Sequence, residues 1–110
     1  MPDAIAWTPA EDGATVGHTG AEGGEIWKDE ECPDGARITL ERDTLLGAPF
    51  AISCAVYGWL VQTRFFADEP TAVQQYEIMK TALAEIAELV VAERSTEAAD
   101  AVDRFSEQFP

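Results

Sequence analysis

Basic residues are scarce in this chain. Lys and Arg together make up only 7 of the 110 residues, against 21 Asp and Glu, so the formal net charge is -14. The few cations are scattered singly along the sequence, and none precedes Lys28. Because a nucleic-acid backbone is bound by clustered Lys and Arg side chains, nucleic acid is not an expected partner.

The excess of acidic residues is the strongest signal in the composition. Self-repulsion at this net charge opposes the compact state, so the charge needs a compensating reason. One explanation is a basic protein partner, or mimicry of a polyanion. The other is an acidic bias of the whole proteome, as in a salt-adapted organism. Both explanations stay open at the level of the sequence.

Long apolar runs are also missing. No stretch approaches the 18 or more consecutive apolar residues that are typical of a membrane-spanning helix. The start, Met1-Pro2-Asp3, has neither the basic region nor the apolar segment of a secretory signal peptide, unless one was removed before this numbering begins. We therefore expect a soluble, cytoplasmic protein that does not act on membranes.

Histidine and cysteine are rare, which removes most catalytic and metal-binding patterns. The single histidine, His18, lies in a Gly-rich stretch without apolar neighbours that would fix its geometry. Cys32 and Cys54 are too few for a disulfide framework, and zinc would lack its third and fourth Cys or His ligands. The glycines of residues 13–20 do not lie between a strand and a helix, as in a phosphate-binding loop. We predict no catalytic, cofactor-binding or metal-ligating residues, and no enzyme activity.

Residues 1–24 form the first of two predicted regions. They contain two prolines and five glycines without a sustained hydrophobic period, which predicts an irregular, partly mobile segment. Trp7 is predicted to dock this segment onto the rest of the chain, because burying an indole contributes roughly 2–3 kcal/mol. Residues 25–110 are predicted to form a single α+β domain.

Alternating apolar residues and a Pro-Asp-Gly turn predict an antiparallel hairpin with strands near 25–32 and 36–44. Two registers are open to it. We favour the one that sets Trp27 on the apolar face with Ile38 and Leu40, because the other places charged residues of the first strand opposite these two side chains.

A second hairpin is predicted from strands near 50–57 and 59–67, joined by a two-residue turn at Tyr57-Gly58. With that turn, the core face carries Phe50, Ile52, Cys54, Val56, Trp59, Val61, Thr63 and Phe65. A three-residue loop is the alternative, and it would set the Phe50 face against Leu60, Gln62, Arg64 and Phe66. The opposite face carries Ala51, Ser53, Ala55, Leu60, Gln62 and Arg64, which are small and mixed rather than predominantly charged. Its small and apolar members, together with two spare aromatics near the C-terminus, give the predicted interaction surface: Ala51, Ser53, Ala55, Leu60, Phe105 and Phe109.

Apolar residues at steps of four and three predict a long helix over 69–93, opened by an acidic cap. At about 1.5 Å per residue this helix is roughly 37 Å long, nearly twice a typical strand. The period slips near residues 94–96, which predicts a break with Ser95 or Thr96 as the cap. A second helix over 96–109 is then predicted to pack at one end of the domain.

These elements predict an α+β fold: a four-stranded antiparallel meander with the long helix across its Phe50/Trp59 face and a short C-terminal helix. Phe105 and Phe109 would either fold back onto the domain or dock on a second subunit. A pocket between sheet and helix is predicted around Tyr57, Trp59 and Tyr76.

Three function hypotheses follow from this architecture. The first is a small, non-enzymatic protein-interaction module that acts as a homodimer, because the second sheet face is uncharged and the long helix overhangs the sheet. The second is an acidic protein that binds or neutralises a basic protein partner, as immunity proteins and secretion chaperones do. The third is a small-molecule binder that uses the pocket between sheet and helix.

Overall fold

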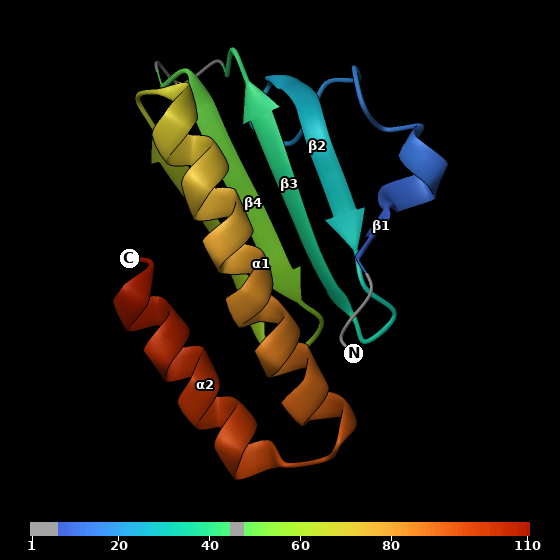
Figure 1. The fold of residues 1–110 in the computed structure, drawn as a ribbon, viewed down its shortest axis with the longest axis vertical. Helices are drawn as coiled ribbons and strands as arrows, with labels where there is room; N and C mark the ends of the chain where they lie inside the picture. Colours follow the sequence, from blue (N-terminus) through green and yellow to red (C-terminus); the bar gives the residue numbers. More distant parts are fainter. Residues whose placement is uncertain (1–6, 45–47) are drawn as a thin grey trace.

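The computed structural model describes residues 7–44 and 48–110. Predictions that concern residues 1–6 or 45–47 lie outside the described residues. The described elements form one sheet with both helices on the same side of it (Figure 1). In chain order they are β1 (Thr8–Pro9), a 3-10 helix (Ala10–Gly13), β2 (Glu25–Glu31), β3 (Ala36–Arg42), β4 (Phe50–Val56), β5 (Leu60–Phe66), α1 (Glu69–Val91) and α2 (Ser95–Gln108).

The sheet is antiparallel and its strands lie in the order β1-β2-β3-β4-β5. The predicted α+β class, long helix and short C-terminal helix are confirmed, but the sheet has five strands rather than four. The extra strand, β1, comes from the segment predicted to be irregular, and it pairs with the end of β2. Trp7 packs against the core with Lys80 Nζ 5.6 Å from its ring centre, so its predicted docking role is confirmed.

The predicted register of the β2–β3 hairpin is wrong over most of its length. After an irregularity at Trp27, Lys28 pairs with Leu40 and Glu30 pairs with Ile38. A bulge of this kind adds one residue to one strand, which moves every later side chain to the other face. Lys28 and Glu30 therefore lie on the face that the helices cover.

Hydrogen-bonding partners on α1 stabilise the Glu30 carboxylate on that face. The buried Tyr76 hydroxyl donates a hydrogen bond of 2.7 Å to Glu30 Oε1, and Lys80 Nζ lies 3.1 Å from the same oxygen. Burial by itself would raise the pKa of Glu30, but the hydrogen bonds from Tyr76 and Lys80 outweigh it and hold that pKa below its usual range. Burial, together with the neighbouring Glu30, raises the pKa of Tyr76. Glu30 thereby ties β2 to the middle of α1.

The β4–β5 hairpin also adopts the register that the sequence disfavoured. Gly58 has a φ of 79°, and the Trp59 N–H donates to the Val56 carbonyl, as in a type II turn that requires glycine at its third position. The loop is therefore three residues long, and Val56 pairs with Leu60. The β5 residues on the helix-covered face are Leu60, Gln62, Arg64 and Phe66, and not Trp59, Val61, Thr63 and Phe65.

Arg64 lies on this largely apolar face because its guanidinium is engaged there. Its Nη1 donates a hydrogen bond of 2.8 Å to Gln75 Oε1, and its Cζ lies 5.0 Å from the ring centre of Phe66 and 5.3 Å from that of Phe109. Burial lowers the pKa of Arg64. Gln62, two residues earlier, donates a hydrogen bond to the Phe109 carbonyl, so both polar residues on this face of β5 fasten the C-terminus to the sheet.

The two helices form an antiparallel pair. α1 starts after Asp68, whose carboxylate accepts a hydrogen bond of 2.9 Å from the Thr71 N–H, as the acidic cap predicts. α2 runs back alongside α1 rather than packing at one end of the domain (Figure 1). Its N-cap is Arg94 without a side-chain capping bond, so the predicted cap at Ser95 or Thr96 is wrong.

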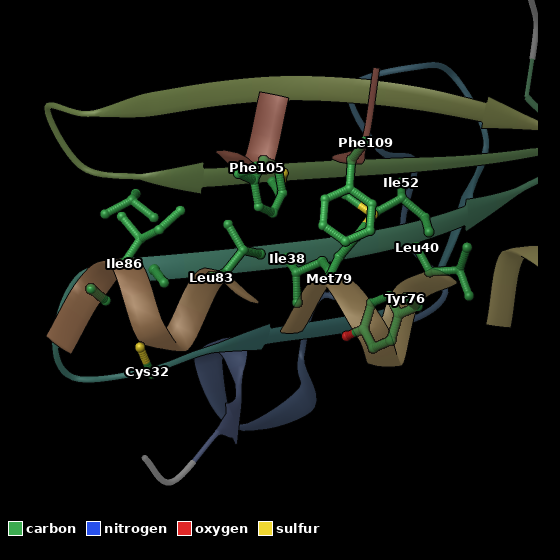
Figure 2. Close-up of a cluster of buried hydrophobic side chains, with 14 of the residues drawn as sticks. Cys32, Ile38, Leu40, Ile52, Tyr76, Met79, Leu83, Ile86, Phe105 and Phe109 are labelled. Carbon is green, nitrogen blue, oxygen red and sulfur yellow. The ribbon is translucent and has the colours of Figure 1, made fainter. Parts of the chain in front are cut away.

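The core lies between the sheet and the helices. Phe105 and Phe109 of the C-terminal segment point into it with ring centres 4.7 Å apart, so they fold back onto their own domain (Figure 2). The other large, fully buried side chains include Ile38, Leu40, Ile52, Tyr76, Met79, Leu83 and Ile86.

Substitution of Phe109 should show how much the last residues contribute to the core. Because its ring is fully buried, Phe109→Ala is expected to lower the free energy of unfolding by about 3 kcal/mol, measured by urea unfolding. Gln108→Ala, at an exposed neighbouring position, is the control and should change it by less than about 0.5 kcal/mol. A loss at Phe109 no larger than the control's would contradict this packing.

Candidate functional site

The face of the sheet turned away from the helices, here called the open face, is the main candidate surface. Directly paired residues of neighbouring strands point to the same face, so the pairing assigns each side chain. The open face carries Ile26, Asp29, Glu31, Arg37, Thr39, Glu41, Ala51, Ser53, Ala55, Val61, Thr63 and Phe65. It divides into a half that the N-terminal segment covers and a half along β5 that is exposed.

A buried carboxylate holds the N-terminal segment onto the first half. Glu41 is only 1% exposed, and its Oε1 accepts hydrogen bonds from the Gly24 N–H at 3.0 Å and the Glu22 N–H at 3.1 Å. A Cβ on Gly20 would lie 2.3 Å from the Glu41 carboxyl carbon, so only glycine allows this close approach. The Gly-rich segment around residues 20–24 therefore packs around the Glu41 carboxylate and is held by it.

Asp29 and Arg37 form the polar floor of the same half. Arg37 Nε and Nη2 donate to the two Asp29 carboxylate oxygens at 3.0 and 2.6 Å, and the Thr39 hydroxyl lies 3.0 Å from Oδ1. Burial by itself would raise the pKa of Asp29, but the hydrogen bonds from Arg37 and Thr39 outweigh it and hold that pKa below its usual range. The hydrogen bonds to Asp29 raise the pKa of Arg37.

Two adjoining hollows lie between the covered half and the exposed half. They measure about 250 and about 300 Å³, and Ala21, Arg37, Thr39 and Ser53 line both. Arg37, the cation that lines them, is already neutralised by Asp29. The hollows are at or below the lower limit for ligand pockets, and the described residues that line them include no unpaired cation to recognise an anion.

The exposed half of the open face follows β5. Val61 is 86% exposed and Phe65 is 44% exposed, with Thr63 exposed between them. These three side chains form an apolar stripe on a strand that carries no Asp or Glu.

α2 is equally poor in charge on the side that borders β5. Arg104 and Gln108 line the cleft between α1 and α2. At about 3.6 residues per turn, the opposite side of α2 carries Ser95, Ala99, Val102 and Ser106. The hydrogen bond from Gln62 to the Phe109 carbonyl places the end of the chain, just after α2, over the helix-covered face of β5. This side of α2 and the stripe therefore flank the β5 edge from opposite faces of the sheet. We call Val61, Thr63 and Phe65 together with Ser95, Ala99, Val102 and Ser106 the uncharged flank.

The two edges of the sheet differ in how well they are protected against pairing with another chain. At one edge, β1 is only two residues long and ends in Pro9, and the neighbouring β2 is charged and bulged. Short strands, proline, charge and bulges all prevent a sheet edge from pairing with another chain. At the other edge, β5 has seven residues without proline or bulge, and among the described residues it pairs only with β4. β5 is an unprotected edge.

The predicted interaction surface is only partly on the open face. Ala51, Ser53 and Ala55 lie there, and Ala51 is buried under neighbouring side chains. Leu60 packs towards the core instead, and Phe105 and Phe109 are buried within it. The sequence analysis missed Val61 and Phe65 because a two-residue turn would have placed them in the core.

The three residues of the predicted pocket do not come together. Tyr57 is 89% exposed at the tip of the β4–β5 hairpin, Trp59 packs against the core, and Tyr76 is fully buried with its hydroxyl on Glu30. The two adjoining hollows described above lie on the opposite side of the sheet from the helices.

The remaining candidate groups do not assemble into a reactive site in the described part of the chain. His18 is exposed, and both thiols are buried and free. Burial raises the pKa of Cys54 to about 12, which suppresses its thiolate. Within residues 7–44 and 48–110, no group of three or more His, Cys, Asp or Glu side chains could hold a metal ion.

Neither helix of the described chain combines the length and the apolar character needed to cross a bilayer.

Comparison with protein-family models, with curated proteins and with solved structures finds no match for this chain. What it does has to be inferred from its own surface.

The paired Asp29 predicts a defined pH dependence of stability. Its folded-state pKa is lowered, so its contribution is complete above the unfolded pKa of about 3.9 and is lost as pH falls through the folded value. The free energy of unfolding of Asp29→Asn should therefore lie below that of the wild type at neutral pH, and the gap should close as the solution is acidified. Urea unfolding from neutral to strongly acidic pH tests this, with Asp103→Asn on exposed α2 as the control. A gap that stays constant with pH would contradict the account.

Proposed function

We propose that this chain is a non-enzymatic protein-interaction module that acts as a homodimer, and that two copies meet through the uncharged flank. The supporting observation is the distribution of charge. A chain with 21 Asp and Glu and a net charge of -14 has no acidic residue on this flank. Two such molecules repel each other over most orientations, so self-association is least opposed where the charge is missing.

The flank also supplies a driving force for association. Val61 and Phe65 expose apolar surface to water, and removing that surface from water favours contact by about 25 cal/mol per Å². Ser95, Ala99 and Ser106 are small, so the helices of two copies can approach closely. Arg64, the only charged residue of β5, is engaged with Gln75 on the core side and does not block the contact.

Light scattering on a sizing column tests the proposal. The wild type is expected to elute as a dimer, at twice 11.9 kDa, in the micromolar range. Val61→Glu should weaken the dimer by at least about tenfold in its dissociation constant, because it removes apolar contact and adds a charge on both copies. Val91→Glu makes the same substitution at an exposed valine near the end of α1 and should leave the dimer intact. A wild type that stays monomeric at high micromolar concentration would refute the homodimer.

A second candidate function is the binding of a basic protein, and the outer surface of the helices favours it. Residues 69–108 contain nine exposed acidic residues and three basic ones. Of those three, Lys80 is bonded to Glu30 and Arg94 to Glu97. The acidic residues are Glu69, Glu77, Glu85, Glu88, Glu93, Glu97, Asp100, Asp103 and Glu107.

Binding to a cationic probe protein tests this candidate with two variants of equal net charge. If the helix layer is the surface, Glu85→Lys combined with Glu88→Lys should abolish binding of the probe at low salt. Glu22→Lys combined with Glu31→Lys, on the sheet side, should reduce it much less. The wild-type complex should dissociate as ionic strength rises towards about 0.5 M, since exposed charges are then screened within a few Å. Equal effects of both variants would mean non-specific attraction and would count against a dedicated surface.

A further inference from the structure

We infer that two copies of this chain pair β5 with β5 in antiparallel orientation, centred on Thr63, so that the two sheets become one continuous ten-stranded sheet. This inference rests on the proposed homodimer and specifies its geometry. An edge strand presents unpaired backbone N–H and C=O groups, and an identical antiparallel strand related by a two-fold axis satisfies both sets.

The edge itself favours a second strand as the occupant. The β1–β2 edge carries the usual protections against strand addition, whereas the seven residues of β5 carry none of them. β5 is also rich in β-branched and aromatic side chains, which suit pairing on a sheet. A second copy fits this edge better than a charged strand of another protein does. The flank on both sides of β5 offers no charge that could recognise such a strand.

The register follows from three requirements. Full overlap of all seven residues is obtained only when the strand is centred on Thr63, which sets Val61 opposite Phe65 of the second copy. A shift by an odd number of residues would oppose open-face and core-face side chains. A shift by one residue pair in one direction would set Arg64 opposite Arg64, and like charges directly opposite each other are destabilising.

The centred register also gives partners to groups that lack them. Val61 and Phe65 become a β-branched and aromatic cross-strand pair on the open face, which is a favourable combination. On the other face, Arg64 of one copy lies opposite Gln62 of the other. Gln62 Oε1 is buried without a hydrogen-bond partner in the described part of the chain, and the Nε and Nη2 groups of Arg64 donate no hydrogen bond there.

The helix layer permits the same contact. With β5 at the two-fold axis, the sides of the two α2 helices that face away from α1 come towards each other. Those sides carry Ser95, Ala99, Val102 and Ser106, whereas Glu97, Asp100 and Glu107 lie elsewhere on α2. Among the acidic residues of α2, only Asp103 borders the side that approaches the second copy.

Cysteine cross-linking tests the register with the full chain under mild oxidation. Paired residues in an antiparallel sheet have Cα atoms about 4.5–5.5 Å apart, which a disulfide can span. Thr63→Cys should therefore link to its own copy. Val61→Cys alone should link at least about tenfold more slowly, because its copy is about 13 Å away along the strand. A mixture of Val61→Cys and Phe65→Cys should give a mixed disulfide, identified by mass spectrometry.

The possible outcomes test the β5–β5 pairing separately from the existence of the homodimer. The wild type is the control for the native thiols, which are both buried. A dimer in light scattering in which Thr63→Cys links no faster than Val61→Cys would overturn the β5 pairing and leave the homodimer standing, for example with two open faces packed about 10 Å apart. A monomer in light scattering would overturn both, and the edge would then be left for a strand of another protein.

Discussion

The structure depends on one constraint of its sheet. Both faces carry apolar side chains that have to be shielded from water, but both α-helices lie on the same face. α1 and α2 bury the face of Ile38, Leu40 and Ile52, and the described chain has no further α-helix for the other face. Part of that face is closed by the N-terminal segment, which Glu41 holds through backbone N–H groups. The part along β5 is left exposed, and there the sequence places Val61 and uncharged residues.

The same one-sided arrangement explains how the acidic charge is tolerated. The exposed carboxylates lie on the outer side of the helices, on loops and at the two ends of β2, where water screens them. The two most buried ones are Asp29, which is paired with Arg37, and Glu41, which accepts backbone hydrogen bonds. Charge is thus kept away from β5, and the molecule has one side on which a second copy meets little repulsion.

The elements could be predicted from the sequence, but their registers could not. The helical period of α1 and the turn residues between strands are local signals, and they gave both helices and the four long strands. The registers depend on a bulge at Trp27 and on a loop one residue longer than expected. They also require polar residues on the core face, such as Glu30 and Arg64, whose partners on α1 and in the C-terminal segment are distant in sequence. The exposed stripe was missed because the wrong register buried it.

Hydrogen exchange in β5 at increasing protein concentration tests the central claim most directly. In a monomer, the outward-facing amides of Leu60–Phe66 have no partner and exchange rapidly; in the paired dimer, they are hydrogen-bonded to the second copy. The account predicts that exchange in β5 slows as the concentration rises through the dimerisation range, while exchange in β3, in the middle of the sheet, does not change. Exchange in β5 that is independent of concentration would contradict it.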